Sequence, residues 1–348
     1  MVSRFLYAFI KMYVNISLRF YFNRLEVHGR ENLKGNGPFL LTSNHQNAFM
    51  DGLLIVAVNS FSVHFLSRAD IFKKAWARKL LAFCKSQPIY RIRDGWDSLG
   101  KNQEAFDNCV KIFLKKESIL IFPEGNHGLT RKLRPLSKGF TRIAFEAQRQ
   151  HPEMNLQVVP LGINYSHHQA FNSRVSIYFG KPVPVSEYYK EPLAQQSTLF
   201  KGRLAGEIKK LIAHIDDEAR YEEILNKLKA SNPDFFNPNE TNERIRKIET
   251  GETIAASARK TPWIYSFLSL LKPLAYLINY PVIAGWRKFS ERIKEPVFIT
   301  SLKFGYGIFV VQAYYLLISG VSAIWIGWWW GLVYLGLLSS LKILRKPV

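Results

Sequence analysis

The chain has 348 residues, 47% of them hydrophobic, and a formal net charge of +21. Its length suits one large α/β domain with an appendage, or two ordinary domains, and so basic a chain is expected to meet an anionic partner, either nucleic acid or an anionic lipid surface. The basic residues are spread along the sequence without a zinc-finger, basic-zipper or RNP-type motif, which argues against nucleic acid, and two cysteines imply no disulfide framework.

Residues 1–24 predict an amphipathic helix that lies on a membrane. Arg4, Lys11 and Arg19 interrupt its apolar residues, and no small-residue cleavage site of a signal peptide follows. Basic residues mixed with aromatic and aliphatic ones are typical of helices at a membrane surface. An equally weighted alternative is a helix packed on the core of its own domain.

Residues 25–185 predict an α/β domain, because short apolar runs alternate with helical patterns. This alternation is typical of a mainly parallel sheet flanked by helices on both faces. The predicted strands are 25–29, 39–42, 63–67, 87–91, 119–122, 158–165 and 175–179. The predicted helices are 52–58, 72–84, 98–115 and 139–150.

Residues 186–262 predict a charged helical extension. Its clearest helical patterns lie at 199–215 and 219–228, and a polar, helix-like stretch at 241–260 leads toward the C-terminal region. A segment rich in proline and asparagine, residues 232–240, separates the two parts and is expected to form turns.

Residues 263–348 predict a C-terminal helical membrane region. The run 304–341 contains 38 consecutive residues without Asp, Glu, Lys or Arg, and one membrane-spanning helix needs about 20 apolar residues. We therefore expect a transmembrane hairpin at 299–341 that turns near Ser319 and Gly320. The alternative is a buried helical hairpin within a soluble core.

Charge predicts the orientation of this membrane region. Basic residues flank both ends of the hairpin, and such flanks face the cytoplasm. The protein is therefore expected to be integral to the membrane, with its α/β domain on the cytoplasmic face. The preceding segment, 263–286, contains Pro273 and Pro281 and is expected to be an interfacial or re-entrant element. The flanking basic residues are Arg287, Lys288, Arg292, Lys294, Lys342, Arg345 and Lys346.

His45 and Asp51 are the first candidate catalytic pair. Six residues along a helix turn through about 600°, which leaves the two side chains about 120° apart. His45 is therefore expected in the strand-to-helix turn, with Asp51 in the first helical turn folding back to its ring. Asp51 would fix the tautomer, and the other ring nitrogen would take a proton from a hydroxyl. By itself this spacing favours an N-capping turn with an incidental histidine, with Asn44 and Asn47 as capping residues.

The segment FPEG, residues 122–125, strengthens the catalytic interpretation. It ends a predicted strand, so Glu124 places a carboxylate at the same edge of the sheet as His45, while Gly125 allows a close backbone approach to a ligand. His127 is a second, less favoured candidate base. A basic loop that suits phosphate, or alternatively a solvated or lipid-facing patch, follows. It contains Arg131, Lys132, Arg134 and Lys138.

Four blocks in this order resemble the glycerolipid acyltransferase superfamily, which includes the lysophosphatidate and glycerol-3-phosphate acyltransferases. NHQNAFMD resembles its NH-x4-D block, PIYRIRD its second block, FPEGNHG its FPEGTRS block and VVPLGI its final block. The resemblance covers roughly residues 25–185. Two departures stand out: five residues rather than four separate His45 from Asp51, and Asn126-His127-Gly128 replaces Thr-Arg-Ser.

The resemblance implies a role for each candidate residue. His45 would be the general base and Asp51 its orienting partner, while Arg91 would hold the phosphate of the acceptor. Arg131 or Arg134 would replace the arginine that is missing after Gly125. The remaining expected substrate-binding residues are Asn44, Glu124 and Gly125.

The implied reaction moves an acyl group from acyl-CoA or acyl carrier protein, as co-substrate, to a hydroxyl of a glycerophosphate lipid precursor. No metal and no bound cofactor are expected. The expected acceptor is 1-acylglycerol-3-phosphate. The expected partners are membrane lipid, the lysophospholipid substrate and acyl carrier protein as a potential donor, without nucleic acid. The alternatives are acylation of glycerol 3-phosphate, acylation of another amphiphile such as an aminolipid, and a non-catalytic membrane lipid-binding protein.

Overall fold

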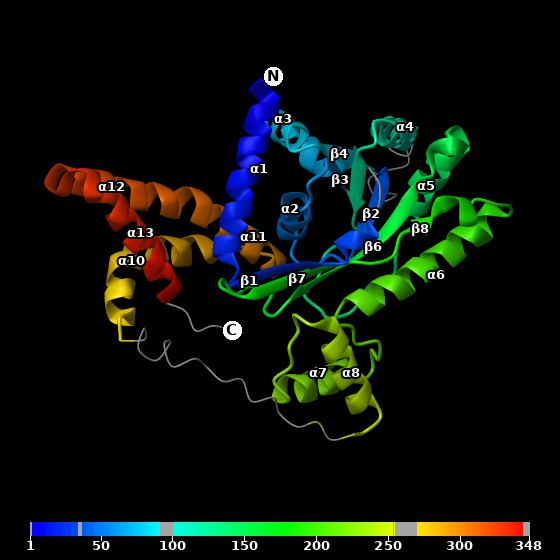
Figure 1. The fold of residues 1–348 in the computed structure, drawn as a ribbon. Helices are drawn as coiled ribbons and strands as arrows, with labels where there is room; N and C mark the ends of the chain where they lie inside the picture. The colour runs from blue at the N-terminus through cyan, green and yellow to red at the C-terminus, as the bar shows by residue number, and fades with distance from the viewer. Residues whose placement is uncertain (1, 34–36, 91–99, 253, 255–269, 344–348) are drawn as a thin grey trace.

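The computed structural model describes residues 2–33, 37–90, 100–252, 254 and 270–343 (Figure 1). Within these residues, an eight-stranded sheet has the order β1-β7-β6-β2-β5-β3-β4, with β8 beside β6. The pairs around β2, β3 and β5 are parallel, whereas β7 and β8 run antiparallel to β6. The predicted fold class, a mainly parallel sheet flanked by helices, is confirmed. The strands are β1 (Arg24–His28), β2 (Phe39–Ser43), β3 (Val63–Arg68), β4 (Ser86–Ile89), β5 (Ser118–Ile121), β6 (Gln157–Tyr165), β7 (Arg174–Phe179) and β8 (Val183–Pro184).

Helices cover both faces of the sheet. Neighbouring residues of a strand point to opposite faces, and in the central strands both sets are apolar, so each face has a core to bury. In β2, Leu40 joins the core beneath α4 (Gly100–Leu114), α5 (Gly139–Gln150) and α6 (Leu193–Leu211). Leu41 joins the core beneath α1 and α2 on the other face. Because α6 buries Phe200, Leu204 and Ile208 in the first core, the packing of the sheet continues past the predicted boundary at residue 185. The other helices of this part are α1 (Val2–Tyr21), α2 (Phe49–Val58) and α3 (Ala75–Phe83).

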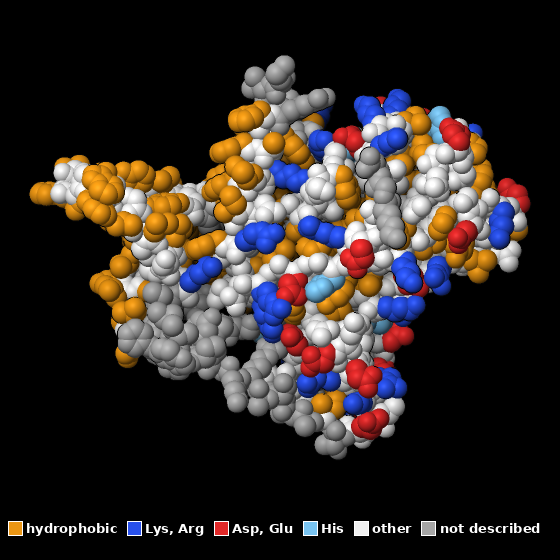
Figure 2. Space-filling view, viewed as in Figure 1, with side chains coloured by type: hydrophobic (Ala, Val, Ile, Leu, Met, Phe, Trp, Pro, Cys, Tyr) orange, Lys and Arg blue, Asp and Glu red, His pale blue; other side chains and the backbone are white. Residues whose placement is uncertain are grey.

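Helix α1 has two different faces. Its inner face packs on the domain, where the Lys11 ammonium donates to the Asn59 carbonyl at 2.6 Å and the Asn15 amide donates to the Ala57 carbonyl at 2.7 Å, so both side chains bind the end of α2. Its outer face exposes apolar residues, and Figure 2 shows hydrophobic side chains along this helix. The packed inner face agrees with the alternative of a helix on the core of its own domain, whereas the membrane contact of the outer face stays a prediction. The exposed apolar residues are Phe5, Leu6, Phe9, Ile10, Met12 and Ile16.

Helices α7 (Tyr221–Ala230) and α8 (Pro238–Glu249) form a small unit with a core of its own, below the sheet in Figure 1. They lie within residues 186–262, the predicted charged helical extension. Asn237 caps α8, since its side chain accepts from the Glu240 amide.

The C-terminal region is a helical hairpin whose side chains are largely exposed and apolar (Figure 2). The segment Pro296–Lys342 is long and apolar enough to cross a membrane by length and composition. Within it, α11 (Ile299–Tyr306) continues through a π-helical turn into α12 (Gln312–Ile326), and α13 (Trp330–Ile343) packs back on α12.

The hairpin turns at Gly327 and not at Ser319 and Gly320, which lie inside α12. Gly327 has φ +57°, a conformation that a residue without Cβ adopts without strain. The 14 residues of α13 extend about 21 Å at 1.5 Å each, which is shorter than the ~30 Å hydrocarbon core of a bilayer. Helix α10 (Lys272–Ser290) overlaps the segment expected to be interfacial or re-entrant, ends four residues beyond it, and packs beside the hairpin. Residues 263–269 of that segment lie outside the described residues.

Candidate functional site

His45 lies in the turn between β2 and α2, and Asp51 lies in the first turn of α2. His45 Nδ1 is 2.9 Å from Asp51 Oδ2. The arrangement inferred from helix geometry is therefore present, with the histidine before the helix and the carboxylate folding back to it. β2, β5 and β6 are parallel neighbours, so the segments that follow them meet at the same edge of the sheet.

The Asp51 carboxylate is fully buried and surrounded by donors. Oδ2 accepts from the amides of Gln46 and Asn47 at 2.7 and 2.8 Å, and Oδ1 accepts from the Tyr165 hydroxyl at 2.6 Å. Burial and the charge of Asp51 raise the pKa of Tyr165 well above its usual value, so Tyr165 remains a donor. An ionised carboxylate only accepts, so His45 carries its proton on Nδ1 and Nε2 is the basic ring atom.

Aromatic residues hold the His45 ring from two sides. The ring stacks on Phe122 with centroids 4.0 Å apart, and His127 meets it edge to face at 5.5 Å. The His45 side chain is 15% exposed, which leaves part of the ring open to a substrate. Burial, helped by the neighbouring His45, lowers the pKa of His127. His127 thus lies near the His45–Asp51 pair, which we call the dyad. Of these two histidines, His45 is the one that contacts the buried Asp51 carboxylate directly.

Glu124 fixes the backbone of His45. Its Oε1 accepts from the His45 amide at 2.8 Å, and its Oε2 accepts from Arg134 Nε at 2.6 Å. The carboxylate is 3% exposed, and burial raises the pKa of Glu124 while the Arg134 guanidinium acts in the opposite direction. Glu124 therefore stabilises the turn that holds His45 and orients Arg134, which also donates to the carbonyls of Asn126 and His45.

The structure separates the two arginines expected to replace the missing one. Arg134 is 27% exposed beside the dyad and can meet a ligand there. Arg131 is buried: it donates to the carbonyls of Tyr165 and Ser166 at 2.9 and 3.2 Å and lies 3.4 Å over the Phe235 ring. The expectation that Arg131 binds substrate is corrected, because a phosphate would have to displace this packing.

Asn44 is also structural and not a substrate ligand. Its side chain is buried, donates to the Ile163 carbonyl at 3.0 Å and accepts from the Ile163 amide at 2.8 Å. It thereby continues the pairing of β2 with β6 beyond the end of β2. Gly125 lies in the loop after β5 with φ +69° and open space where a Cβ would stand. Arg91 lies outside the described residues.

The segment between α10 and α11 forms a wall of the site that sequence reasoning missed. The centroid of the Phe298 ring is 5.1 Å from that of His127 and 5.9 Å from that of Phe49. Beside it is a pocket of about 280 Å³ that combines apolar and basic residues. No local signal links this segment to residues 45–51, about 250 positions earlier. The pocket is lined by Phe289, Arg292, Ile293, Lys294, Glu295, Phe298 and Leu302.

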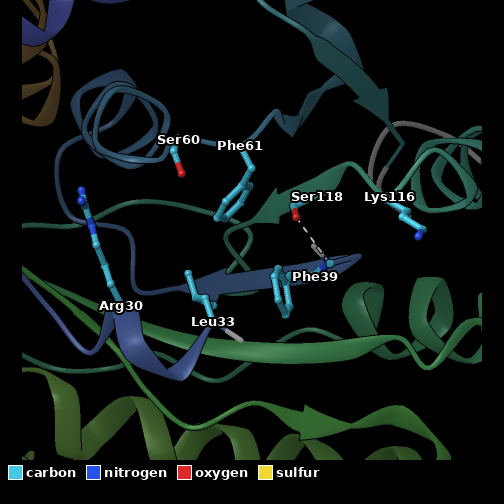
Figure 3. Close-up of a pocket in the computed structure, with 8 residues that line it drawn as sticks. Arg30, Leu33, Phe39, Ser60, Phe61, Lys116 and Ser118 are labelled. Carbon is cyan, nitrogen blue, oxygen red and sulfur yellow. Dashed lines mark hydrogen bonds between the residues drawn. The ribbon is translucent and has the colours of Figure 1, made fainter. Parts of the chain in front are cut away.

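A second cavity, of about 460 Å³, lies at the opposite edge of the sheet (Figure 3). Its lining includes Phe39 and Ser118, the first residues of β2 and β5, with Arg30 and Lys116 nearby. Since His45 is the second residue after the end of β2, the length of that strand separates this cavity from the His45–Asp51 pair. It is not part of the site.

Comparison with known proteins supplies a family for the sheet domain. A family model described as Acyltransferase matches residues 24–164. The chain is 35% identical to glycerol-3-phosphate O-acyltransferase 1 of Saccharomyces cerevisiae over 23% of its own length and 10% of that relative. It is 28% identical to a chloroplastic 1-acyl-sn-glycerol-3-phosphate acyltransferase of Brassica napus, over 40% of this chain and 39% of the relative. The chain thus spans a tenth to two fifths of these relatives.

Among solved structures, the chain is similar to the 1-acyl-sn-glycerophosphate acyltransferase of Thermotoga maritima. The TM-score is 0.43 at 18% sequence identity, with 60% of this chain and 81% of that chain covered.

Proposed function

Because residues 24–164 belong to the glycerolipid acyltransferase superfamily, we propose that the chain transfers an acyl group from acyl-CoA or acyl carrier protein to a hydroxyl of 1-acylglycerol-3-phosphate. The observation that carries this proposal is the contact of 2.9 Å between His45 and a fully buried Asp51 at the carboxyl edge of the sheet.

In the proposed reaction His45 is the general base. Its Nε2 takes the proton of the acceptor hydroxyl as the hydroxyl oxygen attacks the thioester carbonyl. Asp51 holds Nδ1–H and stabilises the imidazolium that forms. When the tetrahedral intermediate collapses, the carbon–sulfur bond breaks, and the proton on Nε2 passes to the departing thiolate. The products are an ester and a free thiol, and His45 is again neutral.

Charge and apolar surface beside the dyad favour an amphiphilic acceptor with an anionic head. Arg134 lies at the site with its side chain partly exposed, and Arg292 and Lys294 line the neighbouring pocket. Phe298 and Leu302 line the same pocket and suit an acyl chain. Glycerol 3-phosphate has the phosphate but no chain, so it would use only part of this surface.

The decisive experiment is an acceptor panel with the purified full chain in lipid nanodiscs. The panel contains 1-acylglycerol-3-phosphate, glycerol 3-phosphate, a lysophospholipid with a neutral head and a long-chain amine, each with acyl-CoA and with acyl carrier protein. We expect the highest kcat/KM with 1-acylglycerol-3-phosphate. Faster turnover of the amine or of glycerol 3-phosphate would reassign the acceptor. Binding of lysolipid without turnover of any acceptor would favour the lipid-binding protein.

We further propose that the protein is an integral membrane protein whose α/β domain lies on the cytoplasmic face. The exposed apolar residues of α1 adjoin those of the C-terminal hairpin, since the Tyr13 hydroxyl donates to the Ile308 carbonyl at 2.8 Å. Exposed apolar side chains this extensive mark an interaction with lipid or protein. The run of apolar residues in Pro296–Lys342 favours lipid.

Glutamate substitutions on the outer face of α1 are expected to weaken membrane binding. We predict that Phe9→Glu combined with Ile16→Glu lowers the fraction that floats with anionic vesicles, because two exposed apolar side chains become charged. A version shortened before residue 270 should show the largest change, since the hairpin is then absent. Leu199→Glu, at an equally exposed apolar residue of α6, is the matched control and should float like the wild type. Equal flotation of all variants would contradict the role of α1.

A further inference from the structure

The first turn of α11 contacts the catalytic turn directly. The Ser301 hydroxyl accepts a hydrogen bond from the Met50 amide at 3.0 Å and donates one to the Asn47 carbonyl at 3.2 Å. Both partners lie between His45 and Asp51 in sequence. A residue about 250 positions downstream therefore binds the turn that holds the dyad.

Helix α2 lacks the cap that a helix usually has at this end. Its N-cap residue, Ala48, makes no side-chain capping bond, and its backbone has φ +42°, which is strained for a residue with a Cβ. An N-cap side chain normally accepts from the second or third amide of the helix. Met50 supplies the second amide of α2. Its N–H is shared between the Asn47 carbonyl, at 2.9 Å, and the Ser301 hydroxyl, which acts as a capping acceptor from another helix.

This turn also sets the position of the Asp51 carboxylate. The Asn47 amide donates to Asp51 Oδ2, while the Asn47 carbonyl is the atom that accepts from Ser301. The same peptide region thus binds Ser301 on one side and the catalytic carboxylate on the other. Loss of the Ser301 contacts would leave the Asn47 carbonyl and the Met50 amide bonded to each other, at 2.9 Å, but would remove the support from α11 for the turn that positions Asp51.

Neighbouring contacts fix the position of Ser301. The Thr300 hydroxyl donates to the His168 carbonyl at 2.5 Å, and the Lys303 ammonium donates to the Gln169 carbonyl at 2.8 Å. Phe304 is buried in the core of the sheet domain and meets the Tyr21 ring at 5.5 Å. Ser301 is therefore carried by a helix that is anchored on the domain at three points.

We propose that Ser301 is a positioning residue for the His45–Asp51 pair, acting as the N-cap of α2 from the base of the C-terminal hairpin. This inference rests on the proposed acyl transfer. It makes the hairpin a part of the catalytic architecture in addition to a membrane anchor.

The test compares Ser301→Ala with Ser301→Thr in the full chain in nanodiscs. For Ser301→Ala we expect kcat to fall on the order of tenfold, because small displacements of catalytic groups cost rates of this size or larger, with KM unchanged for donor and acceptor. Ser301→Thr retains the hydroxyl and should restore most of kcat. Ser322→Ala removes a hydroxyl that bonds within α12 only, at 2.7 Å to the Ser319 carbonyl, and should behave like the wild type.

A second measurement separates positioning from stability. In an Asp51→Asn background, Ser301→Ala should have little further effect on residual kcat, because the serine acts through that carboxylate. Amide exchange should rise in residues 46–51, and the thermal midpoint should fall by no more than the few degrees that the loss of one helix cap explains. Equal loss of kcat in both backgrounds, or equal loss in Ser301→Ala and Ser301→Thr, would overturn the inference. Wild-type kcat in Ser301→Ala, with His45→Ala inactive, would also overturn it and leave acyl transfer intact. Full activity of His45→Ala would overturn the proposed function itself.

Discussion

Replacing His45 with alanine is expected to lower kcat/KM for acyl transfer by about 10²- to 10⁴-fold, the range that general-base groups contribute. The His45 ring contacts the buried Asp51 through Nδ1, so its Nε2 is the base that the proposed mechanism requires. Release of free thiol from acyl-CoA with 1-acylglycerol-3-phosphate measures the effect. Because the ring is partly exposed and lies at the edge of the sheet, we expect the thermal midpoint to change little.

His127→Ala is the matched control for this prediction. His127 lies 5.5 Å from His45 between ring centroids but contacts Phe298 on its other side. We expect a loss of less than about tenfold, because an aromatic contact contributes ~0.5–1.5 kcal/mol. Asp51→Asn should lie between the two in activity and should also destabilise the protein, since four donors surround the carboxylate. A larger loss in His127→Ala than in His45→Ala would assign the base to His127.

The sheet and the dyad could be predicted because they depend on local patterns. Leu40 and Leu41 face opposite cores, as expected for a buried strand between two layers of helices. Helical geometry alone places His45 before α2, and in the structure His45 lies in the turn between β2 and α2. The FPEG segment placed Glu124 at the same edge, where it accepts from the His45 amide.

The supporting contacts of the site could not be predicted because they join distant parts of the chain. Asparagine is a residue type that often caps helices, so the sequence suggests this role for Asn44. In the structure its side-chain amide instead bonds to the backbone of β6, through both its nitrogen and its oxygen. Arg131 and Arg134 were equivalent as members of one basic loop. Only the fold buries Arg131 against Phe235 and brings Arg134 to Glu124. Ser301 carries no sequence signal at all, since its role depends on where α11 packs.

Replacing Glu124 with alanine is expected to reduce both stability and activity. The substitution leaves the Arg134 guanidinium without its buried partner and the His45 amide without its acceptor. Breaking a buried ion pair from one side costs about 3–5 kcal/mol, and the partial exposure of Arg134 places the expected loss near the lower value. Chemical unfolding in detergent measures it. Glu124→Gln still has an oxygen for the His45 amide, so it should retain more activity than Glu124→Ala at similar protein yield.

Replacing Arg134, the partner of Glu124, is expected to make the stability of the folded protein fall more steeply with rising pH. Burial raises the pKa of Glu124, and the Arg134 guanidinium counteracts that effect. In Arg134→Met the counteracting charge is gone, so the pKa of Glu124 rises further above its ordinary value than in the wild type, and the folded protein binds this proton still more tightly than the unfolded chain does. Stability that depends on this proton is present at low pH and is lost as the pH rises above the ordinary value for glutamate. Arg134→Met should therefore be closer to wild-type stability at pH 5 than at pH 8.

The double variant Glu124→Gln with Arg134→Met tests the assignment of this pH dependence to Glu124. It has no titrating group at position 124, so the additional loss of stability between pH 5 and pH 8 should disappear. Arg134→Met should also raise the KM for 1-acylglycerol-3-phosphate, because the proposed phosphate contact is lost, and the double variant should have an equally raised KM. If the double variant kept the pH dependence, another group would be responsible. If KM returned to the wild-type value, Arg134 would serve only to hold Glu124, and the acceptor phosphate would have to bind elsewhere.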